Sequence, residues 1–484
     1  MKEFLFLILL TWPVLAKGQD VNTDYQSFRK DLLNDYQKYR KGVLDDYADY
    51  LAGIWKEFQL FRGVKRDETP KPVVVPNVED IPTNPVPQKL PAPNVTPKEE
   101  PQVPPKVPVI KPIEPAKPIN APTLDFTFYG VQLRSMKMKV FHLSSLEPSA
   151  ISDVWRLYQK SNPKEVINSL ASYSRLYGLN DWFKTELVRR YVDTLLMDGS
   201  SSDRIVLQHF LLANLGFDIR LASTQRQLLL LVPCKQQMYE RSFLRIDGQK
   251  YYIFYDDVSA IQESSIAIYT CSLPSDVYKG ELVDLVYNYN SLTLKSGSDK
   301  KCILTDGRIS VNTSVNSGMM EMFRHYPLMD VPYYAASMVL PAFHKEVLEQ
   351  IKPQLSGMTQ RQAANALLHF VQYAFDYATD GEQHGYEKPY FLEENFYYPK
   401  NDCEDRSIIY AFLVHNLMGL DVHLVQYPGH ECTAVNFGNQ SVDGDGYLYN
   451  GRVFIICDPT YIGASIGQCM PAYQPVQPIV EEWY

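Results

Sequence analysis

The sequence predicts an α+β protein with an antiparallel sheet. Helical and strand patterns come in blocks, and the strands are joined by turns typical of hairpins. The helical patterns cover residues 150–159, 181–196, 203–215, 359–377 and 404–417. The strand-like runs cover residues 126–133, 228–232, 251–255, 421–425 and 453–457. Asn450-Gly451, between residues 447–449 and 452–457, is the strongest hairpin turn because both positions favour a left-handed backbone.

The composition is that of a globular protein with one unusual segment. At 484 residues the chain has room for roughly two to four domains. Its 47 basic and 56 acidic residues give a net charge of −9 and a pI of about 5.6, so it lacks the basic surface of a nucleic-acid-binding protein. Seven cysteines in so long a chain exclude a small disulfide scaffold. Of the 33 prolines, 17 lie between Pro70 and Pro122.

Residues 1–18 have the features of a signal peptide. Lys2 precedes an apolar run from Phe4 to Leu10, and Ala16-Lys17-Gly18 places small residues where a signal peptidase cuts. The run is too short to span a bilayer, which needs about 20 residues. No cysteine precedes Cys234, which excludes a lipoprotein anchor. We therefore expect an exported protein, periplasmic or secreted, with no transmembrane segment in the mature chain.

Two further segments separate this signal from the globular part. In the segment 19–63, apolar and aromatic side chains from Tyr25 to Phe61 make ten steps over 36 residues, a period of 3.6 that predicts one amphipathic helix over 23–62. Its apolar stripe needs a partner: a second copy in a coiled coil, another protein, or the globular part. The segment 64–123 has proline at about every third position, which predicts a disordered, extended spacer without helix or strand.

Three residues in the last third of the chain form a candidate catalytic triad. Cys403 lies at the start of the helical pattern 404–417, where the helix dipole favours a thiolate. His430 follows 27 residues later at the start of a strand, and Asp458 follows another 28 residues later at the end of the next one. A cysteine nucleophile needs a base, and the base needs a third group that fixes its tautomer. These residues supply the three roles in order.

The residues around this triad resemble the transglutaminase-like superfamily, whose fold is similar to that of papain. The run Asp-Cys-Glu-Asp at 402–405 resembles the bacterial transglutaminase-like cysteine proteinases in particular, and the match covers about residues 324–471. The resemblance implies a catalytic domain at 311–484, in which a helix bearing Cys403 packs on an antiparallel sheet, and acyl transfer through a thioester. Lys400-Asn401 departs from the family pattern, so the Cys403 backbone N–H is the safest oxyanion donor.

The acids next to Cys403 create an electrostatic problem. Asp402, Glu404 and Asp405 should raise the pKa of the thiol. Three compensations are open: Asp402 caps the helix, Arg406 pairs with Glu404 or Asp405, or a cation lies among the acids. The resemblance implies Ca²⁺ for the third, with Asp402 and Glu404 as ligands, and hard oxygen donors suit this ion. No other cofactor is required. The acid-glycine segment 443–446 lacks the remaining ligands of a calcium loop and is expected to be a hairpin connection.

Other side chains near the triad have two interpretations. The aromatic residues of 380–401 either form one wall of a substrate cleft or pack beneath a long loop. Cys432 should share the face of His430, since neighbours in a strand alternate, whereas Cys457 should point away from Asp458; we interpret both as core thiols. The remaining cysteines have room for a disulfide in an exported protein: Cys234, Cys271, Cys302 and Cys469.

An internal repeat predicts that residues 124–310 form a degenerate copy of the catalytic domain. Aligning Asp203-Arg204 with Asp405-Arg406 brings helix ends, short strands and hairpin turns into register in both copies. In this alignment Ser201, Gln227 and Asp256 stand in the positions of the triad. A serine at a helix start without a base is no nucleophile, so we expect this copy to be chemically dead.

Three functions are open at this point. The first is an exported cysteine peptidase or amide hydrolase that acts on a protein or peptide substrate in the envelope or outside the cell. The second is a transglutaminase that resolves the thioester with an amine and cross-links proteins. The third is a structural or partner-binding module with a vestigial triad, in which the helix at 23–62 and the spacer carry the function.

Overall fold

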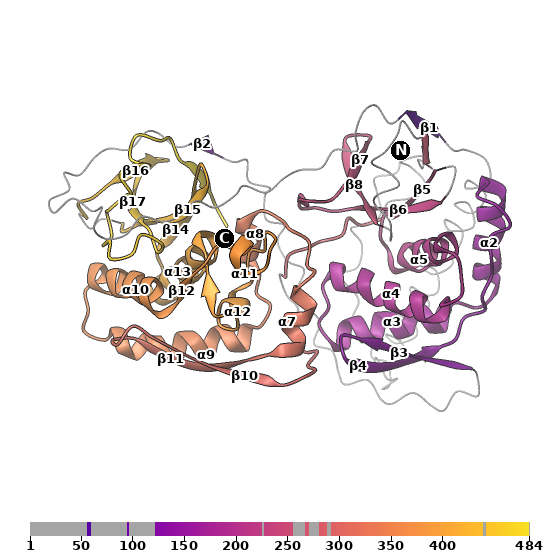
Figure 1. Cartoon of the computed structure of the whole chain (residues 1–484), viewed down its shortest axis with the longest axis horizontal. Coiled ribbons are helices and arrows are strands. Elements are labelled where there is room, and N and C mark those ends of the chain that lie inside the picture. The colour runs from indigo at the N-terminus through magenta and orange to yellow at the C-terminus, as the bar shows by residue number, and fades with distance from the viewer. Residues whose placement is uncertain are drawn as a thin grey trace, which may run out of the picture.

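The protein consists of two lobes that lie side by side, one from each half of the described chain (Figure 1). The computed structural model describes residues 122–224, 227–254, 280–287, 292–438 and 442–483, and the backbone of three short strands at 56–59, 94–95 and 267–270. Each lobe combines helices with a six-stranded sheet, which confirms the α+β class predicted from the sequence.

The first lobe contains a hairpin, four helices and a sheet. The hairpin is formed by β3 (Thr123–Phe128) and β4 (Val131–Met136). The helices are α2 (Pro148–Lys160), α3 (Lys164–Leu176), α4 (Asp181–Leu195) and α5 (Ser201–Leu215). The sheet strands are β1 (Lys56–Gln59), β5 (Arg220–Ser223), β6 (Leu228–Pro233), β7 (Phe243–Ile246), β8 (Gln249–Phe254) and β9 (Ala267–Thr270), in the order β1-β9-β5-β6-β8-β7.

The second lobe begins with the hairpin of β10 (Asp299–Thr305) and β11 (Ser310–Asn316). Its helical part contains α7 (Ser317–Phe323), α8 (Val331–Ala336), α9 (Pro341–Ile351), the 3-10 helix η2 (Lys352–Leu355), α10 (Gln360–Ala374), α11 (Asp380–Gln383), α12 (Leu392–Asn395) and α13 (Cys403–Met418). Two short strands, β12 (Asp376–Tyr377) and β13 (Lys400–Asn401), pair in parallel just before α13.

The sheet of the second lobe is antiparallel except at one edge. Its strands are β14 (Asp421–Tyr427), β15 (His430–Asn436), β16 (Gly446–Tyr449), β17 (Arg452–Cys457), β18 (Ile479–Glu481) and β2 (Asn94–Val95), in the order β16-β17-β15-β14-β18-β2. Only the β18–β2 pair is parallel. The predicted Asn450-Gly451 turn joins β16 to β17, with φ of 49° and 76° at its two residues, so this expectation is confirmed.

Five strands of each sheet share one topology, and only the sixth strand differs in direction. The order β7-β8-β6-β5-β9 in the first lobe matches β16-β17-β15-β14-β18 in the second, element by element. The pairing register also matches: Leu230 pairs with Phe254, and Thr433 pairs with Cys457, so corresponding positions differ by 433 − 230 = 457 − 254 = 203. In each lobe one helix packs on the central strand, α5 on β6 and α13 on β15.

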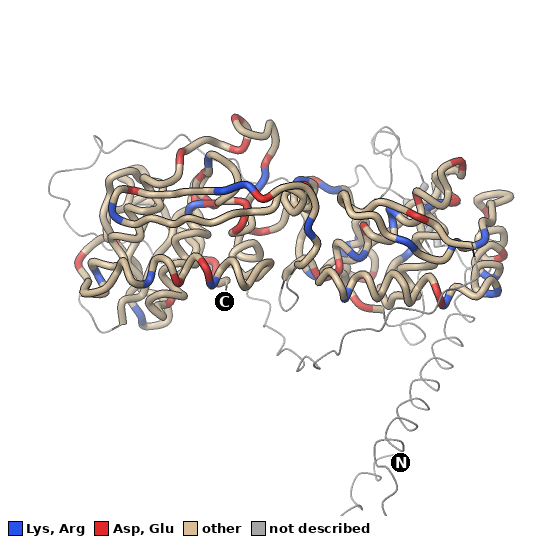
Figure 2. Tube along the Cα trace, turned by 90° about the horizontal axis from the view of Figure 1, so that it is seen from below, with Lys and Arg blue, Asp and Glu red and all other residues tan. Residues whose placement is uncertain are grey.

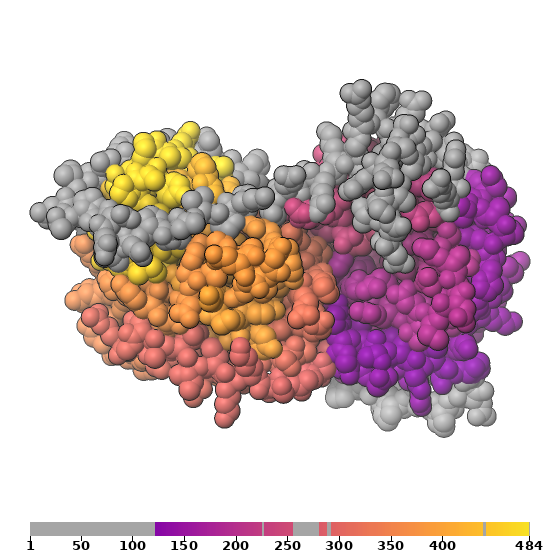
Figure 3. Space-filling model, viewed as in Figure 1, coloured from indigo at the N-terminus to yellow at the C-terminus, as the bar shows by residue number. Residues whose placement is uncertain are grey.

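One hydrophobic core runs through both lobes. Phe183 of α4 lies with its ring centroid 5.5 Å from that of Tyr326 and 6.3 Å from that of Phe323, both in the second half of the chain. Asn180, next to α4, donates a hydrogen bond to the Tyr326 hydroxyl at 2.5 Å. The space-filling view shows the lobes meeting along a broad boundary (Figure 3). The second lobe is therefore packed against the first rather than tethered to it.

The distribution of charged residues and the apolarity of the helices are two further general features. Basic and acidic residues are interspersed along both lobes (Figure 2). Within the part of the chain that the structure describes, no helix has both the length and the apolarity that crossing a bilayer requires.

Two predicted boundaries were wrong. The run 126–133, expected as one strand, is the β3–β4 hairpin, because Tyr129 and Gly130 adopt φ of 43° and 81° and turn the chain. A tyrosine with positive φ is uncommon, which is why the turn was not recognised. The domain boundary expected between 310 and 311 falls inside β11, which packs on α9, while its hairpin partner β10 packs on α10, both in the second lobe.

The signal peptide expected at 1–18, and most of the helix at 19–63 and of the spacer at 64–123, lie outside the described residues. Within these segments two expectations need correction. Lys56–Gln59 is strand β1, paired with β9, although a continuous helix was predicted there. Asn94–Val95 is strand β2, paired with β18, in a segment for which no strand was expected. In both places the edge of a sheet offers unpaired backbone groups, and this pairing outweighs the local pattern.

Candidate active site

Cys403 is the first residue of α13, with Asp402 at the N-cap, as the sequence predicted. The helix starts where Asp402 takes an extended backbone, and Gly419 ends it with a left-handed φ of 64°. The Cys403 side chain is 3% exposed, and its thiol donates a hydrogen bond to Glu404 Oε2 at 3.1 Å. Burial, followed by the charges of Glu404 and Asp402, raises the pKa of this thiol well above its ordinary value. Burial and the neighbouring acids therefore outweigh the helix dipole, which by itself would favour the thiolate. The acids raise the pKa of the thiol, as the sequence predicted.

His430 and Asp458 lie together on neighbouring strands. His430 begins β15, and Asp458 directly follows β17, which pairs with β15. His430 Nε2 and Asp458 Oδ2 are 2.8 Å apart, and both side chains are buried. The other carboxylate oxygen of Asp458 accepts hydrogen bonds from the backbone N–H groups of Thr460 and Tyr461, at 2.9 and 3.1 Å. Asp458 is therefore held in place and holds His430 by one ring nitrogen, which leaves Nδ1 for another partner.

Tyr473 is a site residue that the sequence did not reveal. Its ring stacks on the His430 imidazole, with centroids 5.1 Å apart and planes 13° apart. The pKa of Tyr473 is raised by burial first and then by the charges of Cys403 and Asp458, so all these groups lie within electrostatic reach of one ring. No spacing rule marks a stacking tyrosine that lies 43 residues beyond the histidine (473 − 430 = 43), so no signal in the sequence could have identified it.

Cys403 and His430 line the same pocket. Its other lining residues come from α8 and its N-terminal flank, the strands β14, β15 and β18, the segment before α12, and the first lobe; they are Tyr239, Met329, Asp330, Val331, Glu387, Pro389, Glu404, Gln426, Tyr427, Gly429, Glu431 and Glu481. The structure therefore brings the sequence-predicted nucleophile and base to one opening, with the predicted acid directly behind the base.

Three carboxylates form a compact buried group beside Cys403. Oxygens of Asp380, Asp402 and Glu404 all lie within 4.8 Å of one another. Asp402 is 1% exposed, and both of its carboxylate oxygens lack a hydrogen-bond donor. Burial, followed by the charge of Glu404, raises the pKa of Asp380 to about 8. Such a group is costly to ionise without a cation, and the sequence had predicted only two of its three members.

The expected compensation by Arg406 was wrong. Its guanidinium donates to the Phe375 backbone oxygen at 2.6 Å and lies 5.4 Å from the ring centroid of Tyr377. In the described residues it forms no ion pair with Glu404 or Asp405. Burial lowers the pKa of Arg406 to about 10. Asp405 is engaged elsewhere, because its Oδ1 accepts the Tyr390 N–H at 2.8 Å. Nor does Asp402 cap the helix with its side chain.

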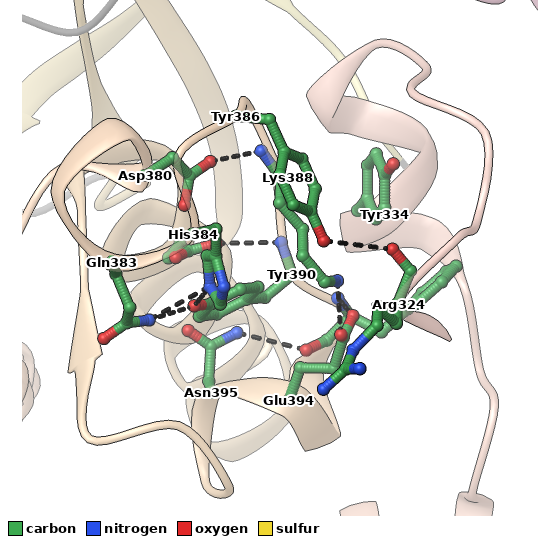
Figure 4. Close-up of polar contacts among 12 residues, drawn as sticks. Arg324, Tyr334, Asp380, Gln383, His384, Tyr386, Lys388, Tyr390, Glu394 and Asn395 are labelled. Carbon is green, nitrogen blue, oxygen red and sulfur yellow. Dashed lines mark hydrogen bonds and ion pairs between the residues drawn. The ribbon is translucent and has the colours of Figure 1, made fainter. Parts of the chain in front are cut away.

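A buried polar framework holds the segment that leads to Cys403 (Figure 4). The Lys388 backbone N–H donates to Asp380 Oδ2, and the Lys388 ammonium pairs with the buried Glu394 carboxylate at 2.5 Å. The Tyr386 hydroxyl donates to the Arg324 backbone oxygen at 3.3 Å, which ties the segment to the region before α8. Asp380 is thereby positioned next to Asp402, which lies 22 residues further along the chain (402 − 380 = 22).

Within the described chain, the aromatic residues of 380–401 do not line the pocket of Cys403 and His430, and only Tyr386 among them is exposed. Tyr390, Phe391 and Phe396 are buried. From this segment only Glu387 and Pro389 line the pocket. Of the two interpretations left open by the sequence, the structure therefore supports loop packing.

The described cysteines are all free thiols: Cys234, Cys302, Cys403, Cys432, Cys457 and Cys469. A disulfide among Cys234, Cys302 and Cys469 is therefore excluded, and Cys271 lies outside the described residues. The Cys432 sulfur lies within 4.8 Å of ligand atoms of both His430 and Asp458, so it shares their face as predicted. In the segment 443–446, Asp445 accepts the Cys469 N–H at 3.0 Å, a structural contact.

Two of the predicted counterparts in the first lobe lie within the described residues. Ser201 is the first residue of α5, as Cys403 is of α13. Gln227 directly precedes β6, whereas His430 begins β15. Asp256 lies outside the described residues.

Comparison of the chain with protein-family models, with curated proteins and with solved structures finds no match.

Proposed function

We propose that this protein is an exported, cysteine-dependent acyl-transfer enzyme that hydrolyses peptide or amide bonds in envelope or extracellular proteins. One observation carries the proposal: His430, paired with the buried Asp458 at 2.8 Å, lines the same pocket as a cysteine at the start of a helix. A cysteine, a base and an orienting acid are the parts of a thiol hydrolase.

The arrangement of elements supports membership of the transglutaminase-like superfamily. The helix bearing Cys403 packs on β15, which begins with His430, in a largely antiparallel sheet. This is the arrangement that the sequence resemblance implies. The matching sheet of the first lobe supports the proposal that this lobe is a degenerate copy, in which a serine replaces the nucleophile and a glutamine replaces the base.

The proposed reaction uses three groups of this chain. Cys403 Sγ attacks the carbonyl carbon of the scissile amide while its proton passes to His430 Nδ1. The backbone N–H of Cys403, in the first turn of α13, donates to the oxyanion. Collapse of the tetrahedral intermediate breaks the C–N bond, and the leaving amine takes the proton from His430. Water, deprotonated by His430, then hydrolyses the thioester and releases the acid and the free thiol.

Asp458 is the orienting residue in this scheme. It accepts the hydrogen bond from His430 Nε2–H, which fixes the tautomer with an unprotonated Nδ1. Tyr473 fixes the plane of the same ring by stacking. Together they hold the imidazole so that its free nitrogen serves as the base.

The proposal includes Ca²⁺ as a bound cation. Asp380, Asp402 and Glu404 would hold it, since their oxygens converge within 4.8 Å and those of Asp402 lack a donor. Bound there, the ion supplies positive charge that offsets the acids beside the Cys403 thiol. Asp380 completes a set of three carboxylates, where the sequence alone gave two.

The test is the substitution Cys403→Ala, with Cys302→Ala as the matched control, because Cys302 is partly buried in the β10–β11 hairpin. Host envelope proteins are incubated with each variant in the presence of Ca²⁺, and new N-termini are counted by mass spectrometry. We expect Cys403→Ala to lower cleavage by about a thousandfold or more and Cys302→Ala to leave it unchanged.

Equal cleavage by Cys403→Ala would refute the proposal. Labelling of Cys403 by iodoacetamide no faster than that of a free thiol at the same pH would favour the alternative of a structural module with a vestigial triad. Incorporation of a primary amine into the same proteins would favour transglutamination. Transglutamination is the second candidate function because acidic side chains line the pocket beside Cys403.

A further inference from the structure

The pocket next to Cys403 is strongly acidic. Five carboxylates line it, and no lysine or arginine is among its lining residues in the described chain; the acids are Asp330, Glu387, Glu404, Glu431 and Glu481. They come from five separate places in the sequence, so the pattern is invisible to motif analysis. A concentration of carboxylates in a partly enclosed site favours a cationic occupant.

Among these acids, Glu431 is buried and has a carboxylate oxygen without a hydrogen bond. It is 4% exposed, lines the pocket, and its Oε1 has no hydrogen-bond donor. Burial raises its pKa well above the ordinary value, and the charges of Glu481, Glu404 and Asp330 add to this effect in that order. A buried carboxylate without a donor costs free energy that a positively charged hydrogen-bond donor would recover.

The strand register places the acids on one side of the sheet. Glu431 pairs with Gln426 in β14, and Glu481 pairs with Leu424, two residues earlier in the same strand. Positions two apart in a strand share a face, so Glu431 and Glu481 point the same way. Asp330, at the start of α8, accepts a hydrogen bond from the Tyr239 hydroxyl and lies close enough to both glutamates to affect their pKa.

The spacing of these acids does not suit a single metal ion. Among the described residues, two groups of ligand atoms fall within 4.8 Å of one another, and neither contains Glu431, Glu481 or Asp330. Carboxylates that are further apart match an organic cation, whose N–H donors point in several directions, better than a small ion that needs all its ligands within about 2.6 Å.

We propose that this pocket is a subsite for a positively charged group of the substrate, a primary ammonium or a guanidinium, held by Glu431 and Glu481 beside the carbonyl that Cys403 attacks. The position next to the thiol rests on the proposed function of Cys403. The cation has two sources: a lysine or arginine side chain of the acyl donor, or an amine that resolves the thioester.

The first experiment measures the charge preference of Cys403 itself. Full-length protein is treated with three methanethiosulfonates of similar size, carrying 2-aminoethyl, methyl and 2-sulfonatoethyl groups, and modification of each cysteine is followed by peptide mass spectrometry. Both rates are proportional to the fraction of Cys403 that is thiolate, so the ratio of the cationic to the neutral rate does not depend on this fraction. We expect this ratio to exceed that of Cys302 by about tenfold or more, and Glu431→Gln and Glu481→Gln each to lower it by about tenfold.

The control is Glu349→Gln, an exposed acid on α9 outside the pocket, which should leave the ratio unchanged. Melting temperatures of all variants show that each one is folded. A ratio equal to that of Cys302, or one unchanged by both pocket variants, would overturn the proposal. Loss of the preference on adding Ca²⁺ to the Asp402→Asn protein would also overturn it, since the pocket acids would then hold a metal ion. Because these reagents react without turnover, the result is independent of whether Cys403→Ala abolishes cleavage.

The second experiment separates the two sources of the cation. Envelope proteins are incubated with wild-type protein and with Glu431→Gln, in the presence of dansylcadaverine. Cleavage sites enriched in lysine or arginine, with the enrichment lost in Glu431→Gln, assign the subsite to the acyl donor. Dansylcadaverine incorporation that is lost in the variant assigns it to the resolving amine. Cleavage without enrichment of lysine or arginine and without dansylcadaverine incorporation would contradict the proposal.

Discussion

At the scale of single residues, the most consequential side chain is Asp402. Its two carboxylate oxygens are buried without a donor, and it adjoins the proposed nucleophile. We expect Ca²⁺ to bind at Asp402, Asp380 and Glu404 and to stabilise the folded state, because a ligand at a hundred times its Kd contributes about 2.7 kcal/mol. The melting temperature should rise by about 5 °C with Ca²⁺ and fall again with EDTA.

Asp402→Asn should remove this response. Asp443→Asn is the matched control, because Asp443 is an exposed acid in the 443–446 connection, where no calcium site is expected. A melting temperature of the wild type that is indifferent to EDTA and Ca²⁺ would contradict the metal site without affecting the triad.

Glu481 gives the acidic pocket a defined pH dependence. Burial, followed by the charge of Asp330, raises its pKa from 4.5 to about 7. Glu481 is therefore neutral below that pH and gains a negative charge as the pH rises through 7. The ratio of cationic to neutral modification of Cys403 should accordingly rise between pH 6 and pH 8, and rise less steeply in Glu481→Gln, where Glu431 remains. The other titratable groups that line the pocket are Asp330, Glu387, Glu404, Glu431, His430, Tyr239 and Tyr427.

The same pKa determines the sign of the effect on stability. A carboxyl whose pKa is raised by folding binds its proton more tightly in the folded state. The contribution of Glu481 is therefore fully present below pH 4.5 and decreases as the pH rises through 7. A ratio that falls with rising pH, or that changes equally in Glu481→Gln, would show that another group controls the pocket.

At the scale of elements, the starts of α5 and α13 are built alike. Asp203 and Asp405 are each the third residue of their helix, and each accepts a backbone N–H of the preceding residues. Asp203 Oδ1 accepts from Leu143, and Asp405 Oδ1 from Tyr390, both at 2.8 Å. The two carboxylates thus anchor equivalent loops over equivalent helix starts.

The arginines that follow these acids repeat the pattern. Arg204 donates to the backbone oxygen of Leu196, the C-cap of α4, and Arg406 donates to that of Phe375, the C-cap of α10. Each arginine connects its helix start to the end of an earlier helix, α4 in the first lobe and α10 in the second. The two units therefore share these structural contacts and differ at the first helix residue, Ser201 in one and the proposed nucleophile Cys403 in the other, as divergence of a duplicated domain would leave.

Elements with local determinants could be predicted from the sequence. The end of α13 follows from Gly419, and the β16–β17 hairpin follows from Asn450-Gly451, because helix-ending glycines and turn residues act within a few positions. The triad followed from the same boundaries. Asp380 and Tyr473 could not be predicted, since tertiary packing alone brings them to Cys403 and His430. The strand β1 could not be predicted either, because its partner lies about 200 residues away, in β9.

At the scale of the whole molecule, the first lobe takes part in the candidate site. Tyr239 lies between β6 and β7 of that lobe and lines the pocket with Cys403. Its backbone N–H donates to the Leu328 oxygen at 2.9 Å, and its hydroxyl donates to Asp330. The first lobe thus supplies part of the wall of this pocket, so the pocket depends on the packing of both lobes.

This shared packing predicts that the two lobes unfold together. Phe183 lies in the continuous core and contacts aromatic rings of the second half of the chain, whereas Phe210, equally buried, contacts Trp155 and Tyr158 inside the first lobe. Differential scanning calorimetry of the wild type should show one transition for the described lobes. Both Phe183→Ala and Phe210→Ala should lose about 3–5 kcal/mol. Phe210→Ala should shift the single transition to lower temperature, and Phe183→Ala should split it, because it weakens the contact between the lobes.

Two transitions in the wild type, or identical profiles for the two variants, would show that the lobes fold independently. The contribution of Tyr239 to the pocket would then vary with the docking of the first lobe.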